Sequence, residues 1–188
     1  DIIAQFLLET SDEKIEFTAN NIEYEFSSGK KGLYDFTFKE ESGRLVGIMG
    51  GSGSGKSTLL NVLNGNYPPS IGEIKINGIG LYESPKLLEG VIGFVPQDDL
   101  LIEELSVFEN LYYNGKLCFG NYEDDKLVEL VNEVLVSIGL FEAKDLKVGN
   151  PLSKTISGGQ RKRLNIALEL IREPSILFVD EPTSGLSS

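Results

Sequence analysis

The sequence predicts an α/β fold with a mostly parallel core sheet, an antiparallel β subdomain and a small α-helical subdomain. Three observations predict it. An apolar run at 45–49 leads through a glycine-rich turn into an apolar helix that opens near Lys56. Alternating apolar residues over 15–38 indicate antiparallel strands, and amphipathic stretches between 106 and 138 indicate helices. A chain of 188 residues can form one domain with a full core and a small attached lobe.

The segments outside the helical region are expected as follows, in chain order. Residues 1–14 are expected to form a short helix ending in a polar turn, as an N-terminal extension without identifiable chemistry. Strands of a small sheet follow over 15–38, with a turn at 27–32, and the strand at 73–78 returns to that sheet. Buried strands are expected at 45–49, 91–95 and 176–179. The last is uninterruptedly apolar and is therefore placed in the centre of a parallel sheet.

The helices carry recognisable boundary signals. Ser106, with Glu109 three residues later, predicts a capping box. A second helix opens at 124–125 and stops at Gly139, and a third is expected from 155 to 171. The single cysteine, Cys118, lies between two apolar residues and is expected to be a buried, unreactive thiol.

The glycine-rich turn fits the phosphate-binding P-loop, G-x-x-x-x-G-K-[ST]. Glycines allow several N–H groups to point into one concavity, which the positive end of the following helix also faces. Lys56 supplies a cation for phosphates, and the Ser57 hydroxyl can ligate Mg²⁺. A flexible Gly/Ser linker is disfavoured, because linkers do not lie between a buried strand and an apolar helix. The sequence thus predicts a P-loop NTPase core with these nucleotide-binding residues: Gly50, Gly51, Ser52, Gly53, Ser54, Gly55, Lys56, Ser57 and Thr58.

A pair of acids follows the last apolar strand. Asp180 would lie at the carboxyl edge of the sheet, where open α/β sheets bind ligands, and suits a Mg²⁺ shell. Glu181 can orient or deprotonate an attacking water. The alternative is a turn acid before Pro182.

The net charge of −12 argues against nucleic acid as a main partner, since phosphate backbones require an excess of Lys and Arg. A polyphosphate can still be bound locally by N–H groups, one lysine and a metal ion.

The P-loop, the segment ISGGQ at 156–160 and the run ILFVDEPTSGL at 176–186 occur here in that order. Together they resemble the ATPase domain of ATP-binding cassette (ABC) proteins, over about residues 15–188. ISGGQ is the most specific of the three segments. Its serine and glycines at a helix N-terminus form a second anion-binding end.

The resemblance implies roles for further residues. Gln97 in FVPQDD is similar to the family's Q-loop glutamine, which reaches Mg²⁺ and the attacking water. An aromatic residue stacks on adenine in this family; Phe26 is expected there with Tyr24 as runner-up, although both also suit a strand core. The segment 183–186 resembles the D-loop. Two domains would dimerise head to tail. The residues of the ISGGQ signature in one copy would then act in trans on ATP held by the other copy; these signature residues are Ser157, Gly158, Gly159 and Gln160.

The run RKR-x-x-I-A-x-E-L-I at 161–171, with DEPTSGL, resembles the White-type, or G-subfamily, exporters. Those proteins carry a transmembrane domain in the same polypeptide, which implies a location at the cytoplasmic face of a membrane. The main alternative is a soluble ABC ATPase of translation or DNA repair. Only about 100 residues separate Lys56 from Ser157, which leaves no room for a repair-type coiled coil. A regulatory nucleotide sensor is a third reading, against which Glu181 argues.

Two features depart from the family pattern. Ser187 stands where the D-loop usually has an acid, and the chain has no histidine, whereas the family's switch histidine lies beyond the D-loop. We therefore expect a single ABC domain lacking that C-terminal part, which binds ATP but hydrolyses it poorly alone. Its expected segments are an extension at 1–14, the β subdomain with the P-loop core at 15–100, a helical subdomain at 101–156, and the signature helix, Walker B strand and D-loop start at 157–188.

Overall fold

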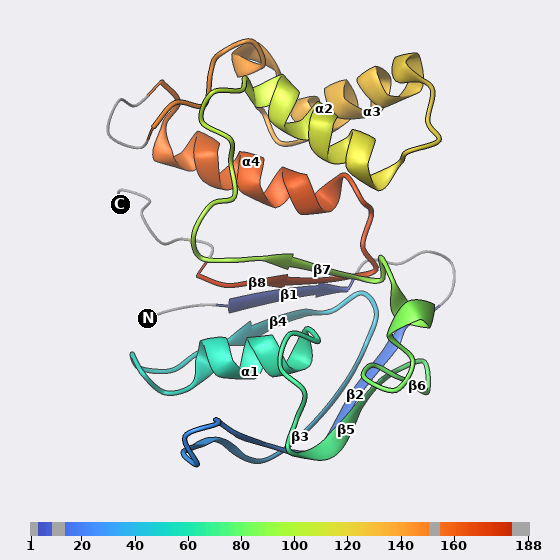
Figure 1. The fold of residues 1–188 in the computed structure, drawn as a ribbon, viewed down its shortest axis with the longest axis vertical. Helices are drawn as coiled ribbons and strands as arrows, with labels where there is room; N and C mark the ends of the chain where they lie inside the picture. Colours follow the sequence, from blue (N-terminus) through green and yellow to red (C-terminus); the bar gives the residue numbers. More distant parts are fainter. Residues whose placement is uncertain (1–3, 9–13, 151–154, 182–188) are drawn as a thin grey trace. The chain divides into compact units, whose positions relative to one another are not determined.

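A computed structural model describes residues 4–8, 14–150 and 155–181 (Figure 1). The chain forms two compact units. The first comprises Asp1–Phe94 with Pro174–Pro182, and the second comprises Val95–Glu173 with Thr183–Ser188. Each unit has its own hydrophobic core.

The antiparallel sheet of the first unit has the strand order β3-β2-β5-β6. β2 (Glu16–Glu25) pairs with β3 (Lys31–Glu41) on one side and β5 (Ile71–Ile76) on the other, and β6 (Ile79–Gly80) extends the sheet. The Phe26 amide donates to the Lys30 carbonyl at 2.9 Å, closing the turn between β2 and β3. The predicted antiparallel β subdomain is therefore confirmed.

The core sheet has the order β4-β1-β8-β7. It contains β1 (Ala4–Leu8), β4 (Leu45–Ile48), β7 (Ile92–Val95) and β8 (Ile176–Val179). β1 runs antiparallel to both β4 and β8, so β4 and β8 point in the same direction. β8 is buried along its whole length, which confirms its central position. The segments that follow β4 and β8 consequently start from the same edge of the sheet (Figure 1).

The expected helix over residues 1–14 is wrong where the chain is described, because residues 4–8 form a strand. A short apolar run suits either structure, and here β4 and β8 offer hydrogen-bonding edges on both sides. Residues 1–3 and 9–13 lie outside the described residues.

Two strands expected to be buried are only partly so. β4 alternates between exposed and half-buried residues, with Leu45 63% exposed, because it is the edge strand of the described sheet. β7 alternates between half-buried and buried residues.

The core of the first unit joins both sheets to α1 (Lys56–Leu63). Phe17 of β2 and Phe178 of β8 meet edge to face at 6.1 Å between ring centroids. Leu60 and Leu63 bury the inner face of α1 in the same cluster. This packing fixes the helix that begins directly after the glycine-rich turn. A short 3₁₀ helix, η1 (Pro85–Leu88), completes this unit.

The second unit packs α2 (Val107–Cys118), α3 (Asp124–Ser137) and α4 (Gly158–Leu170) around one apolar cluster, with a short 3₁₀ helix, η2 (Phe141–Ala143). Figure 1 shows α2 and α3 packed along α4. The predicted capping box opens α2: the Glu109 amide donates to Ser106 Oγ at 3.1 Å, and the Ser106 amide donates to Glu109 Oε2 at 2.8 Å.

Cys118 corrects another expectation, because its thiol is exposed rather than buried. The last buried residue of α2 is Gly115, and Cys118 lies at the end of the helix, beyond the face that packs on the core. Throughout the residues that the structure describes, no helix combines the length and the apolar character needed to cross a membrane.

Candidate functional site

A pocket of about 640 Å³ in the first unit is formed by the glycine-rich turn, the turn between β2 and β3, and the residue that follows Asp180. Because β4 and β8 point the same way, the turn after β4 and the acids after β8 start from one sheet edge. The lining residues are Phe26, Lys30, Lys31, Gly32, Leu33, Tyr34, Ser52, Gly53, Ser54, Gly55, Lys56, Ser57, Thr58 and Glu181.

Backbone geometry shapes the phosphate-facing wall of this pocket. Gly53 and Gly55 have φ angles of 76° and 94°, in the left-handed region that favours glycine. Gly55 is also the N-cap of α1, and a Cβ added there would lie 3.4 Å from the Gly32 carbonyl oxygen. The first turn of a helix leaves N–H groups without intrahelical partners, and these groups attract anions. The turn therefore directs backbone donors into the pocket.

Lys56 closes the turn with its own side chain. Its Nζ donates to the carbonyl oxygens of Gly50 at 2.8 Å and Gly51 at 2.6 Å. The residue is only 9% exposed. Gly50 is sterically restricted as well, since a Cβ there would lie 2.6 Å from Ser54 Oγ. Gly50 and Gly51 thus hold the lysine, while residues 52–58 form the wall.

The pocket is locally basic in an acidic chain. Lys30, Lys31 and Lys56 line it, and Glu181 is the one carboxylate among the described residues of its lining, although the chain carries a net charge of −12. The Glu23 carboxylate accepts a hydrogen bond from Lys31 at 3.0 Å and raises the pKa of that lysine. Local charge of this sign suits a polyphosphate.

Two aromatic residues reach the pocket. Phe26 packs against the backbone of Gly32, where an added Cβ would lie 2.7 Å from the Phe26 ring. Tyr24, the alternative to Phe26, stacks on Tyr67 at 5.5 Å. Tyr34 is 71% exposed and lines the pocket, with Lys31 Nζ 5.6 Å from its ring centroid. Tyr34 was not predicted from the sequence. It lies next to Leu33 but outside the alternating apolar residues that predict the strand, and this position is the signal that could have found it.

The two acids after β8 differ in their surroundings. Asp180 is 6% exposed, and within the described part of the chain its buried Oδ1 has no hydrogen-bond partner. Glu181 is half-buried, lines the pocket and has a φ of 46°, a strained value for a residue with a side chain. Such strain clusters at functional sites, but Glu173 has a similar φ of 50° in the loop after α4, so the position of Glu181 in the pocket is what marks it as a candidate.

Two oxygen groups of the first unit are of the kind that suits a magnesium ion, although Asp180 is not among the described residues that line the pocket. An unpartnered buried carboxylate oxygen on Asp180 and a hydroxyl on Ser57 are hard oxygen ligands of the kind Mg²⁺ takes. The described residues contain no cluster of three or more His, Cys, Asp or Glu that could hold a metal. Mg²⁺ is commonly bound by one or two protein oxygens, with the rest from phosphates and water.

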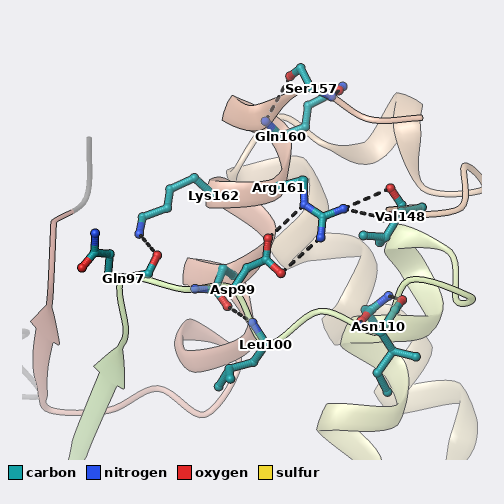
Figure 2. A network of polar contacts seen from close by, with 12 residues as sticks. Gln97, Asp99, Leu100, Asn110, Val148, Ser157, Gln160, Arg161 and Lys162 are labelled. Carbon is teal, nitrogen blue, oxygen red and sulfur yellow. Dashed lines mark hydrogen bonds and ion pairs between the residues drawn. The ribbon is translucent and has the colours of Figure 1, made fainter. Parts of the chain in front are cut away.

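The signature residues lie in the second unit, at the start of α4. Ser157 is the N-cap: the Gln160 amide donates to its Oγ at 3.2 Å, and its own amide donates to Gln160 Oε1 at 2.7 Å (Figure 2). Ser157 and Gly158 are exposed. The expected placement of these residues at a helix N-terminus is confirmed, although α4 begins at Gly158 rather than at residue 155. The Gln160 side chain completes the cap.

Gln97 also lies in the second unit, exposed in the loop after β7. Its carbonyl oxygen accepts from Lys162 Nζ at 3.3 Å. Sequence reasoning missed Asp99 and Arg161, which form an ion pair at 2.9 Å in the same region (Figure 2). The D-loop residues 183–186 and Ser187 lie outside the described residues.

Comparison with known proteins gives this chain its class. Residues 33–184 match the ABC transporter family, which is more than half of the chain. The chain belongs to the ABC transporter family, in the region of its ATPase domain.

The curated relatives include the ABC-type transporter claG of Penicillium crustosum, 38% identical over 91% of this chain and 24% of the relative. ABC transporter G family member 28 of Arabidopsis thaliana is 43% identical over 81% of this chain and 14% of the relative. The chain thus spans less than a quarter of these relatives, and the resemblance to the G subfamily is confirmed.

Among solved structures, cbiO1 from Clostridium perfringens, part of the ABC transporter complex cbiONQ, is 29% identical. It aligns over 93% of this chain and 68% of its own, with a TM-score of 0.78. This likeness confirms the predicted fold class, a P-loop core with an antiparallel β subdomain and helices.

Proposed function

We propose that this chain is the ATP-binding and ATP-hydrolysing motor domain of a membrane transporter, which works by head-to-tail dimerisation. The observation that carries the proposal is the pocket in which the Lys56 turn and the strained Glu181 face the same space. Membership of the ABC transporter family and the G-family relatives favour a transporter over a soluble ATPase of translation or DNA repair.

On this proposal the triphosphate lies against residues 50–58. The N–H groups at the start of α1 and the Lys56 ammonium neutralise its charge. Phe26 stacks on the base, and Tyr34 is the second aromatic residue within the same pocket. Ser57 and Asp180 would hold a Mg²⁺ ion, which when bound neutralises charge on the phosphate oxygens.

Glu181 is the proposed general base. As the oxygen of a water attacks the γ-phosphorus, its proton passes to the Glu181 carboxylate and the bond to the ADP oxygen breaks. Gln97 is proposed to orient that water and to approach the metal ion, with Lys56 stabilising the transferred group.

The second half of the site is proposed to come from another copy of the chain. The signature residues Ser157, Gly158 and Gly159, capped through Gln160, would contact the γ-phosphate bound by the partner's Lys56 turn. A transmembrane domain in the same polypeptide would place this domain at the cytoplasmic face of a membrane. Nucleic acid is not a proposed partner, given the net charge of −12.

Titration calorimetry with Mg-ATP tests the binding step. The wild-type chain is expected to bind, and Lys56→Ala is expected to weaken binding at least about tenfold through loss of one phosphate-facing cation. Lys86→Ala, at an exposed lysine outside the pocket, is the matched control and should bind like wild type. Equal affinity of Lys56→Ala and wild type would exclude this pocket as the ATP site.

Hydrolysis is tested separately with Glu181→Gln. This change keeps the shape of the side chain and removes its ability to accept a proton, so ATP affinity should persist while turnover falls about 100-fold or more. Undiminished phosphate release by Glu181→Gln would remove Glu181 from the mechanism.

A further inference from the structure

The loop after β7, residues 96–102, is held by side chains from α4 and α2; we refer to it as the Gln97 loop. Lys162 is 8% exposed and directs its Nζ to the carbonyl oxygens of Pro96 at 3.4 Å and Gln97 at 3.3 Å. Asn165 Oδ1 accepts from the Leu100 amide at 3.2 Å. The backbone that carries the Gln97 side chain is thus fixed from α4.

Further along the loop, Asn110 of α2 holds Ile102 on both sides. The Ile102 amide donates to Asn110 Oδ1 at 2.8 Å, and Asn110 Nδ2 donates to the Ile102 carbonyl at 3.1 Å. These contacts substitute for the backbone pairs of a strand or helix. The far end of the Gln97 loop is therefore anchored independently of α4.

The strongest contact of the loop is the pair between Asp99 and Arg161. Arg161 Nε donates to Asp99 Oδ2 at 2.9 Å and Nη2 donates to Asp99 Oδ1 at 3.1 Å, which is a bidentate fork. Arg161 Nη1 donates to the Gly149 carbonyl at 2.5 Å, and the residue is 8% exposed. A planar guanidinium bonded on three nitrogens has one orientation, so it transmits position as well as charge.

Arg161 also lies one helical turn after Ser157, the first of the signature residues. Its amide donates to the Ser157 carbonyl at 2.9 Å, and the capping box of Ser157 and Gln160 precedes it directly. The same residue therefore joins the Gln97 loop to the turn that presents Ser157, Gly158 and Gly159 (Figure 2).

We propose that Asp99, Arg161 and Lys162 are positioning residues that make the Gln97 loop and the signature turn, residues 157–160, one rigid element. Neither segment can then change position without the other. The inference rests on the proposed function, in which Gln97 serves one half of an ATP site and the signature residues serve another. The proposal adds three residues that belong to neither half-site. Within one chain, these residues keep the Gln97 loop and the signature turn in a fixed relation.

Hydrogen exchange without nucleotide tests the link itself. Asp99→Asn keeps the side-chain volume but removes the charge, and should raise amide exchange severalfold in both the Gln97 loop and the signature turn. Asp98→Asn, at the exposed neighbouring acid, is the matched control and should change neither segment. A rise confined to the Gln97 loop, or no rise at all, would overturn the proposal.

The functional arm uses the Glu181→Gln background. Asp99→Asn should leave the affinity of one chain for Mg-ATP within about twofold, because it is not a pocket residue, while ATP-driven dimerisation weakens about tenfold. Asp99→Glu, which restores the carboxylate, should recover most of the dimerisation. Unchanged dimerisation in Asp99→Asn, or no recovery in Asp99→Glu, would contradict a positioning role.

The two arms separate this proposal from the proposed function. If the Glu181→Gln chain with native Asp99 neither binds ATP nor dimerises, the proposed function fails, and the exchange experiment still decides whether the two segments are linked. If that chain dimerises and Asp99→Asn behaves identically, only the positioning proposal fails.

Discussion

The pocket of the first unit and the Gln97 loop of the second hold their functional groups by different means. In the pocket, glycine conformations, the start of α1 and one lysine bonded to neighbouring carbonyls do most of the shaping. In the Gln97 loop, buried side chains far away in the sequence hold the backbone, as Lys162 holds the Gln97 carbonyl oxygen across 65 positions. A site built from local backbone can be predicted from a short motif, whereas one built from distant side chains requires the fold.

The largest expected effect comes from breaking the backbone geometry of the pocket. Gly55→Ala puts a Cβ on a residue with φ 94°, a backbone conformation that is strained for any residue with a Cβ, so we expect the turn and the start of α1 to move. We expect ATP affinity to fall about 100-fold, or about 2.7 kcal/mol. Gly120→Ala, where a Cβ meets nothing within 4 Å, is the control. Calorimetry showing equal affinity for Gly55→Ala and wild type would refute a backbone-made site.

The second effect tests the side-chain half of the comparison. Arg161→Met removes the fork to Asp99 and the donor to Gly149 while keeping an unbranched side chain. Because the Asp99 side chain is 30% exposed and can be rehydrated, we expect a loss of about 2 kcal/mol in unfolding free energy. Arg163→Met on the same helix, at an exposed position, should lose less than about 0.5 kcal/mol in urea denaturation. Similar losses for both variants would show that the buried network contributes nothing special.

Tyr82 sharpens the comparison between sites shaped by backbone and sites held by side chains, because its side chain holds backbone within the first unit. Its hydroxyl lies 2.7 Å from the Val62 carbonyl oxygen and 2.6 Å from that of Tyr67, beside the end of α1. Tyr82→Phe should reduce the unfolding free energy by about 1 kcal/mol, measured in urea at pH 7. An unchanged denaturation midpoint would mean that this hydroxyl does not stabilise the end of α1.

Tyr82 also leads us to expect that the unfolding free energy depends on pH. Burial raises the pKa of Tyr82 far above its ordinary value, so the folded state keeps the neutral phenol after the unfolded state has begun to ionise. The contribution is therefore fully present below about pH 10 and is lost as the pH rises above it. Wild type should lose more stability than Tyr82→Phe between pH 9 and 11; parallel pH profiles would contradict this.

The smallest effect concerns the strain at Glu181. A φ of 46° disfavours any residue with a Cβ, so Glu181→Gly should be more stable than Glu181→Ala by about 0.5–1 kcal/mol, although both lose the carboxylate. Thermal denaturation compares the two variants directly. A less stable glycine variant would show that the left-handed conformation is not a source of strain.

Local signals accounted for much of the fold. The P-loop, the capping box of α2, the helix N-terminus at Ser157, the turn between β2 and β3 and the central place of β8 follow from neighbouring residues, and the structure contains them. The strand at 4–8 could not be predicted, because its two partners, β4 and β8, come from distant parts of the chain. Exposure also depends on distant packing, which is why the burial of β4 and of Cys118 was misjudged.

The candidate site shows the same division. Lys56 and Glu181 were predicted, and both line one pocket. Tyr34 and the Asp99–Arg161 pair were not, because no spacing rule places them against their neighbours. In physical terms, charge type and backbone freedom are visible in a sequence, and side-chain pairing across a fold is not.

Sedimentation velocity of Glu181→Gln with Mg-ATP tests the central claim most directly, namely that one ATP site is divided between two copies of this chain. We predict a dimer with ATP and a monomer with ADP. Adding Ser157→Arg in the same background should leave ATP bound but the chain monomeric. A Glu181→Gln chain that binds ATP at saturation and sediments only as a monomer would contradict the divided site.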